Sequence, residues 1–451
     1  MRICKSFEHR SFVSTNAITN ARPTESACAP QPRYQPAPIN VGVDFGTYST
    51  KILIRPRGEE KAELVQIEPS AEGYPWFASP SLVRVVDDKV FFGGLALEKS
   101  GGSLYRSLKV RLLEAIEQTI SPDFQRRDTI TPDLLVAGYL SWVLGRLKRQ
   151  IDARYRYGSP RVFLNMAAPM NHIEDKALKT RYLRIIQAAW ESVFGAGGFP
   201  AEQGMPLKDL ESRFAPWLDR QVPDRTVRLY EVLPETLAPI VSLSLDPRMD
   251  AGMYMIVDMG AGTTEISVNH LGQRHADQIV LCYADESIRI GGDDFSKIED
   301  DLRGQADAIR HHHQELVDRF LKVFRRTWFE GYRKDMANHT ARRRWQQLCV
   351  LLAGGAARRD IILDAIRGNC PMYAFLDCDR LYEVRWHKPI GIEMGHPQEE
   401  HSESDNTLLS VAHGLSVPRQ QWPISFPPSD VEHLPGTEVI EKPPAYWWSE
   451  P

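Results

Sequence analysis

The stretch VGVDFGTYSTK at residues 41–51 joins an apolar run to a glycine turn rich in hydroxyl groups, and MIVDMGAGTTEISV at residues 255–268 repeats this design. In each stretch an aspartate, Asp44 or Asp258, ends the apolar run, and a glycine follows two residues later. Such a pattern predicts a strand that leads into a tight turn. Two copies of one unit suggest duplicated domains that present the same turn to a shared ligand.

Both turns suit a polyphosphate. Glycine lets backbone N–H groups approach phosphate oxygens closely, and hydroxyl side chains add donors. Asp44 and Asp258 are hard oxygen ligands of the kind that Mg²⁺ uses, often through retained water, when it also contacts phosphates. The predicted phosphate-binding residues are Gly46, Thr47, Tyr48 and Ser49 in the first turn, and Gly260, Ala261, Gly262, Thr263 and Thr264 in the second.

Two glycine pairs extend the pattern. IGGDDFS at residues 290–296 predicts another close approach of backbone to a nucleotide, through Gly291 and Gly292. VLLAGGAAR at residues 350–358 predicts a further strand and turn. Its glycines, Gly354 and Gly355, leave room for a flat base and a ribose, and Arg358 is expected to lie along the face of the base.

The composition is typical of a packed protein and not of a nucleic-acid or membrane protein. The 451 residues include 55 Lys and Arg against 59 Asp and Glu, which gives a formal net charge of −4. This balance does not call for a nucleic acid as partner. No apolar run reaches the roughly 18 residues that a membrane span needs. The six cysteines lack a Cys-x-x-Cys pair, which favours a reducing cytoplasm.

The chain ends differ from its middle. Residues 1–38 are polar and end in a run of prolines, which predicts a disordered tail and linker. Prolines recur after residue 416, so residues 417–451 are expected to form an extended arm without long helices or central strands. Its aromatic end, residues 446–448, either packs back on the chain or docks on a partner. Between the ends, residues 133–153 predict a helix that Thr131 caps.

The three glycine turns, in this order, resemble the phosphate-one, phosphate-two and adenosine motifs of the actin, sugar-kinase and heat-shock-chaperone superfamily. The closest likeness is to the nucleotide-binding domain of seventy-kilodalton heat-shock chaperones, over residues 39–416. Four more segments support it: SLKVR (107–111), the helix at 133–153 with VFLNMAAP (162–169), ETLA (235–238) and the glycine pair before Asp293.

The resemblance implies an α/β fold: a two-lobed actin-like ATPase, built of ribonuclease-H-like duplicated domains around a central nucleotide cleft. Lobe I would span residues 39–250 with a subdomain inserted at roughly 75–157. Lobe II would span 251–416, with an insertion at roughly 293–345. The first two turns would each belong to one lobe, and ATP would bind between them.

The resemblance also implies roles. Asp44 and Asp258 would hold Mg²⁺ through water, Lys109 would neutralise charge on the γ-phosphate, and Thr263 would touch that phosphate. Glu235 would orient or polarise the attacking water. Phosphoryl transfer depends mainly on such positioning and electrostatics. Slow ATP hydrolysis coupled to lobe closure is the expected activity, and a partner protein would read the nucleotide state.

Several features depart from the family. Tyr48 stands where the chaperones have threonine, and the helix that clamps adenine in them has no match between Phe295 and Trp345, so the base preference stays open. The proline-rich end shows no β-sandwich pattern of a substrate-binding domain. Peptide chaperoning in the usual sense is therefore not expected.

Other interpretations stay open. Glu235 could be an ordinary surface carboxylate, and Lys109 could belong to a basic face with its arginine neighbours. An actin-like filament protein, which assembles with itself, is the rival function, and a small-molecule kinase is a third. The histidines at 311–313 predict a solvated face and no metal site, because neighbours on a helix cannot all face one ion. The aromatic residues between 320 and 332 predict a core-facing helix stripe.

Overall fold

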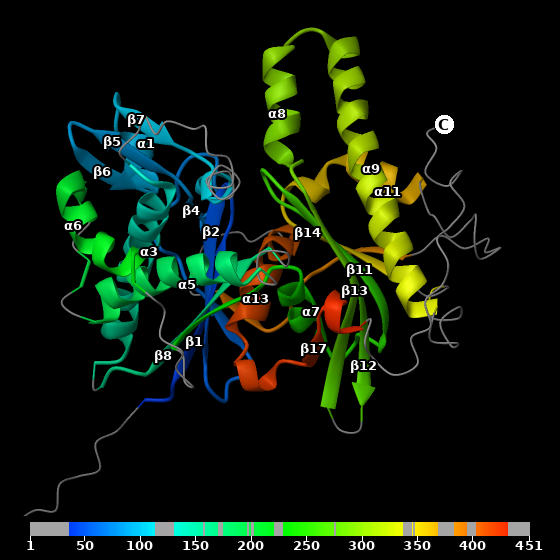
Figure 1. Ribbon diagram of the computed structural model, residues 1–451, viewed down its shortest axis with the longest axis horizontal. Helices are drawn as coiled ribbons and strands as arrows, with labels where there is room; N and C mark the ends of the chain where they lie inside the picture. The colour runs from blue at the N-terminus through cyan, green and yellow to red at the C-terminus, as the bar shows by residue number, and fades with distance from the viewer. Residues whose placement is uncertain are drawn as a thin grey trace, which may run out of the picture. The chain divides into compact units, whose positions relative to one another are not determined.

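Two sheets with the same strand order make up the centre of the structure (Figure 1). The computed structural model describes residues 36–112, 130–156, 158–169, 175–195, 198–199, 203–220, 229–274, 277–336, 345, 348–368, 383–394 and 403–431. These residues form a mixed α/β structure, as the sequence predicts. The expected N-terminal tail up to residue 35 and the aromatic C-terminal end lie outside the described residues.

The first sheet has the order β10-β8-β1-β2-β3-β16, with β4 paired to β2. The second has the order β15-β14-β11-β12-β13-β17. Strands of the first sheet are β1 (Ile39–Phe45), β2 (Ser49–Pro56), β3 (Ala62–Leu64), β4 (Ser79–Pro80), β8 (Val162–Ala168), β10 (Tyr230–Pro234) and β16 (Ile392–Met394). Strands of the second are β11 (Gly252–Met259), β12 (Thr264–Arg274), β13 (Asp277–Ile288), β14 (Cys349–Ala353), β15 (Glu383–Trp386) and β17 (Ile424–Phe426).

Five strands of each sheet repeat one topology. β1 pairs antiparallel with β2 and parallel with β8, and β11 pairs in the same two ways with β12 and β14. The outer neighbours also correspond, since β3 matches β13 and β10 matches β15 in position and direction. The two aspartate turns that the sequence reveals therefore follow the same central strand in each half.

Among the described residues, a third, smaller sheet and several helices belong to the first half of the chain. The sheet has the order β7-β5-β6-β9. Its strands are β5 (Val83–Val86), β6 (Lys89–Phe92), β7 (Ser103–Tyr105) and β9 (Met205–Pro206), and the short helix α1 (Gly94–Glu98) follows β6. The helices are α3 (Pro132–Arg154), α5 (Lys176–Trp190) and α6 (Leu207–Leu218), and a π-helical turn, Glu191–Gly195, extends α5. Strands β5, β6 and β7 and helix α3 occupy the stretch expected as an insertion at 75–157.

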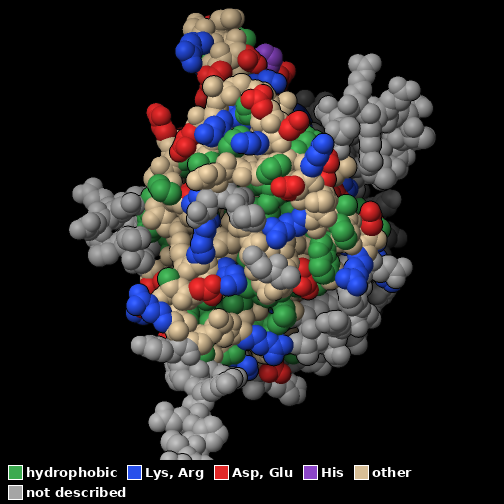
Figure 2. Space-filling model, turned by 90° about the vertical axis from the view of Figure 1, so that its left-hand side faces the viewer, with side chains coloured by type: hydrophobic (Ala, Val, Ile, Leu, Met, Phe, Trp, Pro, Cys, Tyr) green, Lys and Arg blue, Asp and Glu red, His purple; other side chains and the backbone are tan. Residues whose placement is uncertain are grey.

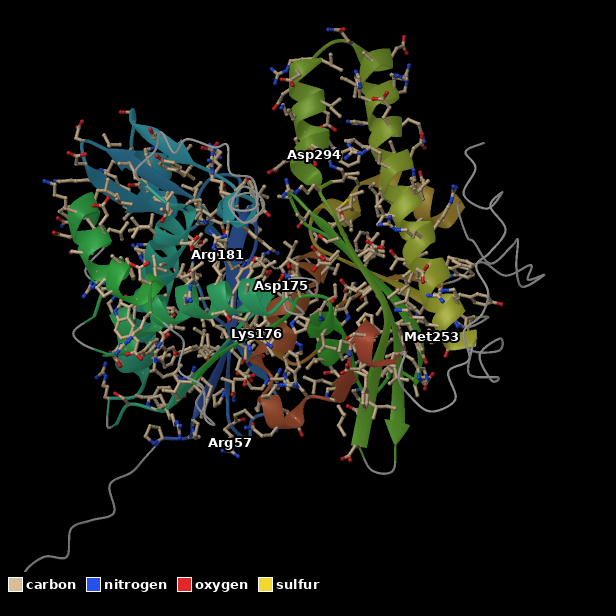
Figure 3. All side chains as sticks on the ribbon, viewed as in Figure 1. Arg57, Asp175, Lys176, Arg181, Met253 and Asp294 are labelled. Carbon is tan, nitrogen blue, oxygen red and sulfur yellow. The ribbon has the colours of Figure 1, made fainter. Side chains whose placement is uncertain are left out.

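Helix α3 begins as its sequence predicts. The Thr131 hydroxyl oxygen accepts a hydrogen bond from the Leu134 N–H at 3.3 Å, and Pro132 occupies the first helical position. Asp133 does more than favour the helix dipole, because both its oxygens accept hydrogen bonds from Nε of Arg181. Figure 3 labels Arg181, which belongs to α5. The predicted helix at 133–153 is confirmed, and its apolar residues are buried.

The second half carries a helical hairpin in the stretch expected as an insertion at 293–345. Its helices are α8 (Gly292–Asp301) and α9 (Ala306–Met336), which lie side by side (Figure 1). Phe320, Phe324 and Trp328 are fully buried, so the predicted aromatic core stripe is confirmed. His311 and His312 are exposed as expected, whereas the ring of His313 packs 5.1 Å from that of Phe295.

The segment after residue 416 is part of the fold and not only an arm. β17 pairs parallel with β13 at the edge of the second sheet, and Val417, Trp422 and Val431 are buried. A proline-rich segment can take this place because an edge strand leaves one row of backbone groups unpaired. Only residues 432–451 of the expected arm remain outside the described part.

Two helices pack against each other between the sheets, α7 (Leu237–Ser244) and α13 (Ser410–Ser416) (Figure 1). Their backbones touch at Gly414, where a Cβ atom would lie 1.8 Å from the carbonyl oxygen of Ala238. On its other side α13 meets Gly42 of β1 equally closely, since a Cβ there would lie 2.2 Å from the Ala412 oxygen. Helix α13 therefore has no space for larger residues at either contact.

Replacing Gly414 with alanine should lower the free energy of unfolding by about 3 kcal/mol, because the methyl group meets rigid backbone. Urea unfolding followed by circular dichroism measures the change. Gly252→Ala is the matched control, since a Cβ there has nothing within 4 Å. Equal stability of the two variants would contradict the close helix contact.

Candidate functional site

Both aspartate turns line one cavity of about 420 Å³, called the shared cavity below. It receives residues from both central sheets, from helix α8 and from the start of α13. The predicted residues that line it are Asp44, Gly46, Thr47, Tyr48, Ser49, Lys109, Glu235, Asp258, Gly260, Ala261, Thr263, Gly292, Gly354 and Gly355. Segments that lie as far apart in sequence as residues 44 and 355 thus meet at one site.

The two turns have the same internal hydrogen bond. The N–H of Gly46 donates to the Ser49 carbonyl at 3.2 Å, and the N–H of Gly260 donates to the Thr263 carbonyl at 2.9 Å. Each turn follows the central strand of its sheet, β1 or β11. The shared cavity is therefore bounded by two equivalent turns, as the duplicated sequence pattern predicts.

Four predicted residues support the cavity from outside it. Thr264 is buried and donates from its hydroxyl to the Ile290 carbonyl at 2.6 Å. Gly291 packs on the second turn, where a Cβ would lie 2.1 Å from the Ala261 oxygen, and Gly262 packs on the Thr47 methyl group. Arg358 differs from the expectation, because its guanidinium donates to the Thr407 hydroxyl at 2.7 Å and does not line the cavity.

The next residue, Arg359, lines the cavity instead. Its guanidinium donates to Glu299 Oε1 at 2.7 Å and to Ser296 Oγ at 2.9 Å, and it lies over the Phe295 ring. Leu408 and Val411 supply apolar surface to the same cavity. A planar cation beside apolar walls suits a flat, weakly polar ring.

Two further charged residues were missed by the sequence analysis, although the strand register places them. Lys51 lies opposite Asp44 in the β1–β2 pair, and Glu265 lies opposite Asp258 in the β11–β12 pair. Both follow their aspartate by seven residues, so a predicted hairpin register could have identified them. The other lining residues without a predicted role are Pro75, Asp293, Ser296, Ala356 and Ser410.

The cavity contains two ion pairs. Lys51 Nζ lies 2.9 Å from Asp44 Oδ2, and Lys109 Nζ contacts Glu235 Oε2. The second pair is buried, with 4% and 10% of the two side chains exposed. Burial alone would lower the pKa of Lys109, but the charges of Glu235 and Glu265 outweigh it and hold that pKa above its usual range. Lys109 is therefore a cation at neutral pH, and Glu235 is not an ordinary surface carboxylate.

Glu265 is the most constrained acid in the site. Only 3% of the residue is exposed, and its Oε1 accepts from the Ser287 hydroxyl at 2.7 Å. Its other oxygen, Oε2, has no hydrogen-bond partner among the described residues. Burial and the charges of Glu235 and Asp285 raise the pKa of Glu265 well above its usual value. The protonated form of this side chain is thus favoured.

The surroundings of Asp258 also disfavour the charged form of its side chain. Burial comes first among the causes, and the nearby charges of Glu235 and Asp44 add to it, so that its pKa rises to about 7. Lys51 and Lys109 oppose the rise but do not cancel it. A cation bound between Asp44 and Asp258 would relieve this repulsion.

The charges that line the cavity are unequal. Five acidic side chains face three basic ones; the acids are Asp44, Glu235, Asp258, Glu265 and Asp293, and the bases are Lys51, Lys109 and Arg359. The described residues include no group of three acidic, histidine or cysteine side chains that could hold a metal alone. Two opposed carboxylates nevertheless fit Mg²⁺, which usually keeps several waters and shares phosphate oxygens.

Tyr48 turns its ring toward the loop before β4. The ring stacks on that of Tyr74 at 4.3 Å between centroids, and its hydroxyl donates to the Gly73 carbonyl at 3.0 Å. The side chain is 41% exposed. Tyr48 lines the cavity, and its ring is held against Tyr74 outside it.

The chain matches no protein-family model and no curated protein.

Within the described part, no helix is both long and apolar enough to cross a membrane. The face of the molecule near α6 and the third sheet carries basic and acidic side chains interspersed with apolar ones (Figure 2).

The raised pKa of Asp258 predicts a pH-dependent stability of the ligand-free protein. The folded chain holds a proton on Asp258 up to about pH 7, whereas an unfolded aspartate loses it near pH 4, so stability falls as the pH rises through this window. Asp258→Asn removes the penalty, and its thermal midpoint should exceed that of the native protein more at pH 8 than at pH 5.5. Differential scanning calorimetry measures both midpoints.

The exposed Asp250, on the loop before β11, provides the control variant Asp250→Asn, which should leave the midpoint unchanged at both pH values. A midpoint for Asp258→Asn that equals or falls below the native value at pH 8 would show that this carboxylate is not strained.

Proposed function

We propose that this protein binds Mg-ATP in the shared cavity and hydrolyses it slowly to ADP and phosphate, as an ATPase similar to the nucleotide-binding domain of seventy-kilodalton heat-shock chaperones. The observation that carries the proposal is the meeting of two equivalent Asp-x-Gly turns, from equivalent strands of two sheets, with Lys109 and Glu235 in one cavity. The repeated strand order supports a duplicated, two-lobed actin-like fold of the ribonuclease-H type. A cytoplasmic location remains part of the proposal.

The metal would be held by Asp44 and Asp258. Mg²⁺, when bound, would neutralise negative charge on the phosphates, which the acidic excess of the cavity would otherwise repel. Backbone N–H groups of the two turns would donate to the phosphate oxygens. Thr47, Ser49 and Thr263, which line the cavity, would add hydroxyl donors.

Lys109 and Glu235 would act as a pair that ATP separates. In the ligand-free protein each neutralises the other. The terminal phosphate, with its greater charge, would attract Lys109, and Glu235 would then be free to accept a hydrogen bond, and finally a proton, from the attacking water. Such an exchange would keep Glu235 paired with Lys109 until ATP binds.

The adenine base of ATP would lie at the other end of the cavity, beyond Gly354 and Gly355. There, Arg359, fixed by Glu299 and Ser296, would present the face of its guanidinium to the ring. Gly354 suits this place because its φ is +77° and a Cβ would lie 2.4 Å from the Met259 oxygen. The choice of purine stays open.

A nucleotide that contacts both sheets would bias their relative arrangement, since binding energy differs between arrangements that complete the site and those that do not. The product of the reaction would then be a change of conformation that a partner protein detects. The partner is proposed to be a protein, and neither a nucleic acid nor a membrane.

Glu235→Gln tests the proposal. The variant keeps the shape of the side chain but cannot accept a proton, so its kcat for ATP hydrolysis should fall by about a hundredfold or more while nucleotide binding remains. Phosphate release under Mg²⁺ saturation gives kcat, and a thermal shift with Mg-ATP reports binding.

The same substitution four residues earlier on β10, Glu231→Gln, serves as control, because Glu231 lies outside the shared cavity and should retain native kcat. A Glu235→Gln protein that hydrolyses ATP at the native rate would disprove the role of Glu235. Failure of the native protein to bind Mg-ATP would overturn the proposed function as a whole.

A further inference from the structure

Four buried polar side chains form a continuous chain of hydrogen bonds behind the shared cavity. Arg55 Nη2 lies 2.9 Å from His413 Nε2, His413 Nδ1 lies 2.8 Å from Ser242 Oγ, and Ser242 Oγ lies 2.9 Å from His387 Nε2. None of the four residues is more than 4% exposed. They come from β2, α13, α7 and the residue after β15, and none belongs to the cavity itself.

The directions of the first two hydrogen bonds in this series follow from Arg55. A guanidinium can only donate, so Nε2 of His413 must accept and the ring proton must sit on Nδ1. His413 then donates to Ser242 Oγ. The Ser242 hydroxyl, which can both donate and accept, also pairs with Nε2 of His387.

Both histidines stay neutral at physiological pH, which preserves these directions. Burial lowers the pKa of His387 to about 4. Burial, followed by the positive charge of Arg55, lowers the pKa of His413 well below its usual value. Arg55 remains a cation, since burial lowers its pKa only to about 10, and it donates to the Glu60 carbonyl and contacts Ser416 Oγ at 3.4 Å.

This series of hydrogen bonds connects the two central sheets. Arg55 belongs to the first sheet, and Nδ2 of Asn165 on β8 also donates to the Leu415 carbonyl of α13 at 2.8 Å. At the other end, the backbone N–H of His387 donates to the Leu352 carbonyl on β14 of the second sheet at 3.0 Å. Helices α7 and α13 form the middle of the connection.

Each connected element also carries a part of the cavity. Helix α7 begins two residues after Glu235, and β14 ends one residue before Gly354. Helix α13 begins at Ser410, which lines the cavity together with Val411. The two helices approach most closely at Gly414 and Ala238, and apolar side chains of both helices pack in one buried cluster.

We propose that Arg55, His413, Ser242 and His387 are positioning residues, which fix α7, α13 and β14 in one register and so align Glu235 with the phosphate turns. Buried polar chains of this kind specify one arrangement because a shift leaves several groups without partners. The catalytic part of this inference rests on the proposed ATPase function, while the structural coupling does not.

Ser242→Ala tests the proposal, because it removes the central hydroxyl and leaves both histidines without that partner. We expect kcat for ATP hydrolysis to fall about tenfold or more, since small misplacements of a catalytic group are costly, while Kd for Mg-ATP changes less than about twofold. Ser242→Thr, which keeps the hydroxyl, should restore kcat. Ser244→Ala is the matched control, because Ser244 lies on the same helix and donates only to the Val241 carbonyl.

Amide hydrogen exchange of the ligand-free proteins separates this inference from the proposed function. Ser242→Ala should speed exchange both in residues 406–417 and in 383–387, whereas Ser244→Ala should not. Faster exchange confined to α7, or equal losses of kcat and ATP affinity, would overturn the positioning role. If the native protein does not hydrolyse ATP, the proposed function fails and exchange alone decides the coupling. If Ser242→Ala does not fold, His387→Gln gives the same readouts.

Discussion

The surplus of carboxylates in the shared cavity is the constraint on which the site depends. Five acids face three bases there, and two of the acids are neutralised by Lys51 and Lys109. Glu265, which is buried, and Asp258, which is half-buried, keep raised pKa values. A fold that keeps such a cluster gives up stability in the ligand-free state, which is typical of sites designed to receive a cation together with its anionic ligand.

The repeated sheet explains how this cluster arises from a simple plan. The same strand register places the residue seven positions after each aspartate directly across from it. In one half that residue is Lys51 and in the other it is Glu265, so equivalent positions carry opposite charges. The two halves therefore present similar backbone turns but different electrostatic surroundings, which would allow one half to neutralise a ligand and the other to polarise it.

Local features of the sequence were enough to predict the strands that lead into the glycine turns, the aspartate turns and the helix at 133–153, because apolar spacing, glycine turns and the Thr131 cap act over a few residues. Contacts between distant elements were not predictable in the same way. Arg359 replaces Arg358 at the cavity because the turn after Gly355 directs the earlier arginine to Thr407. The series of hydrogen bonds from Arg55 to His387 joins residues more than three hundred positions apart. Strand β17 forms only because β13 offers it a sheet edge to pair with.

Isothermal titration calorimetry of the native protein with ATP, in the presence of Mg²⁺ and then of a chelator, tests the central claim most directly. The account predicts binding at one site with Mg²⁺ and much weaker binding without it, because only the divalent cation offsets the carboxylates around the phosphates. Absence of binding, or equal affinity with and without Mg²⁺, would contradict it.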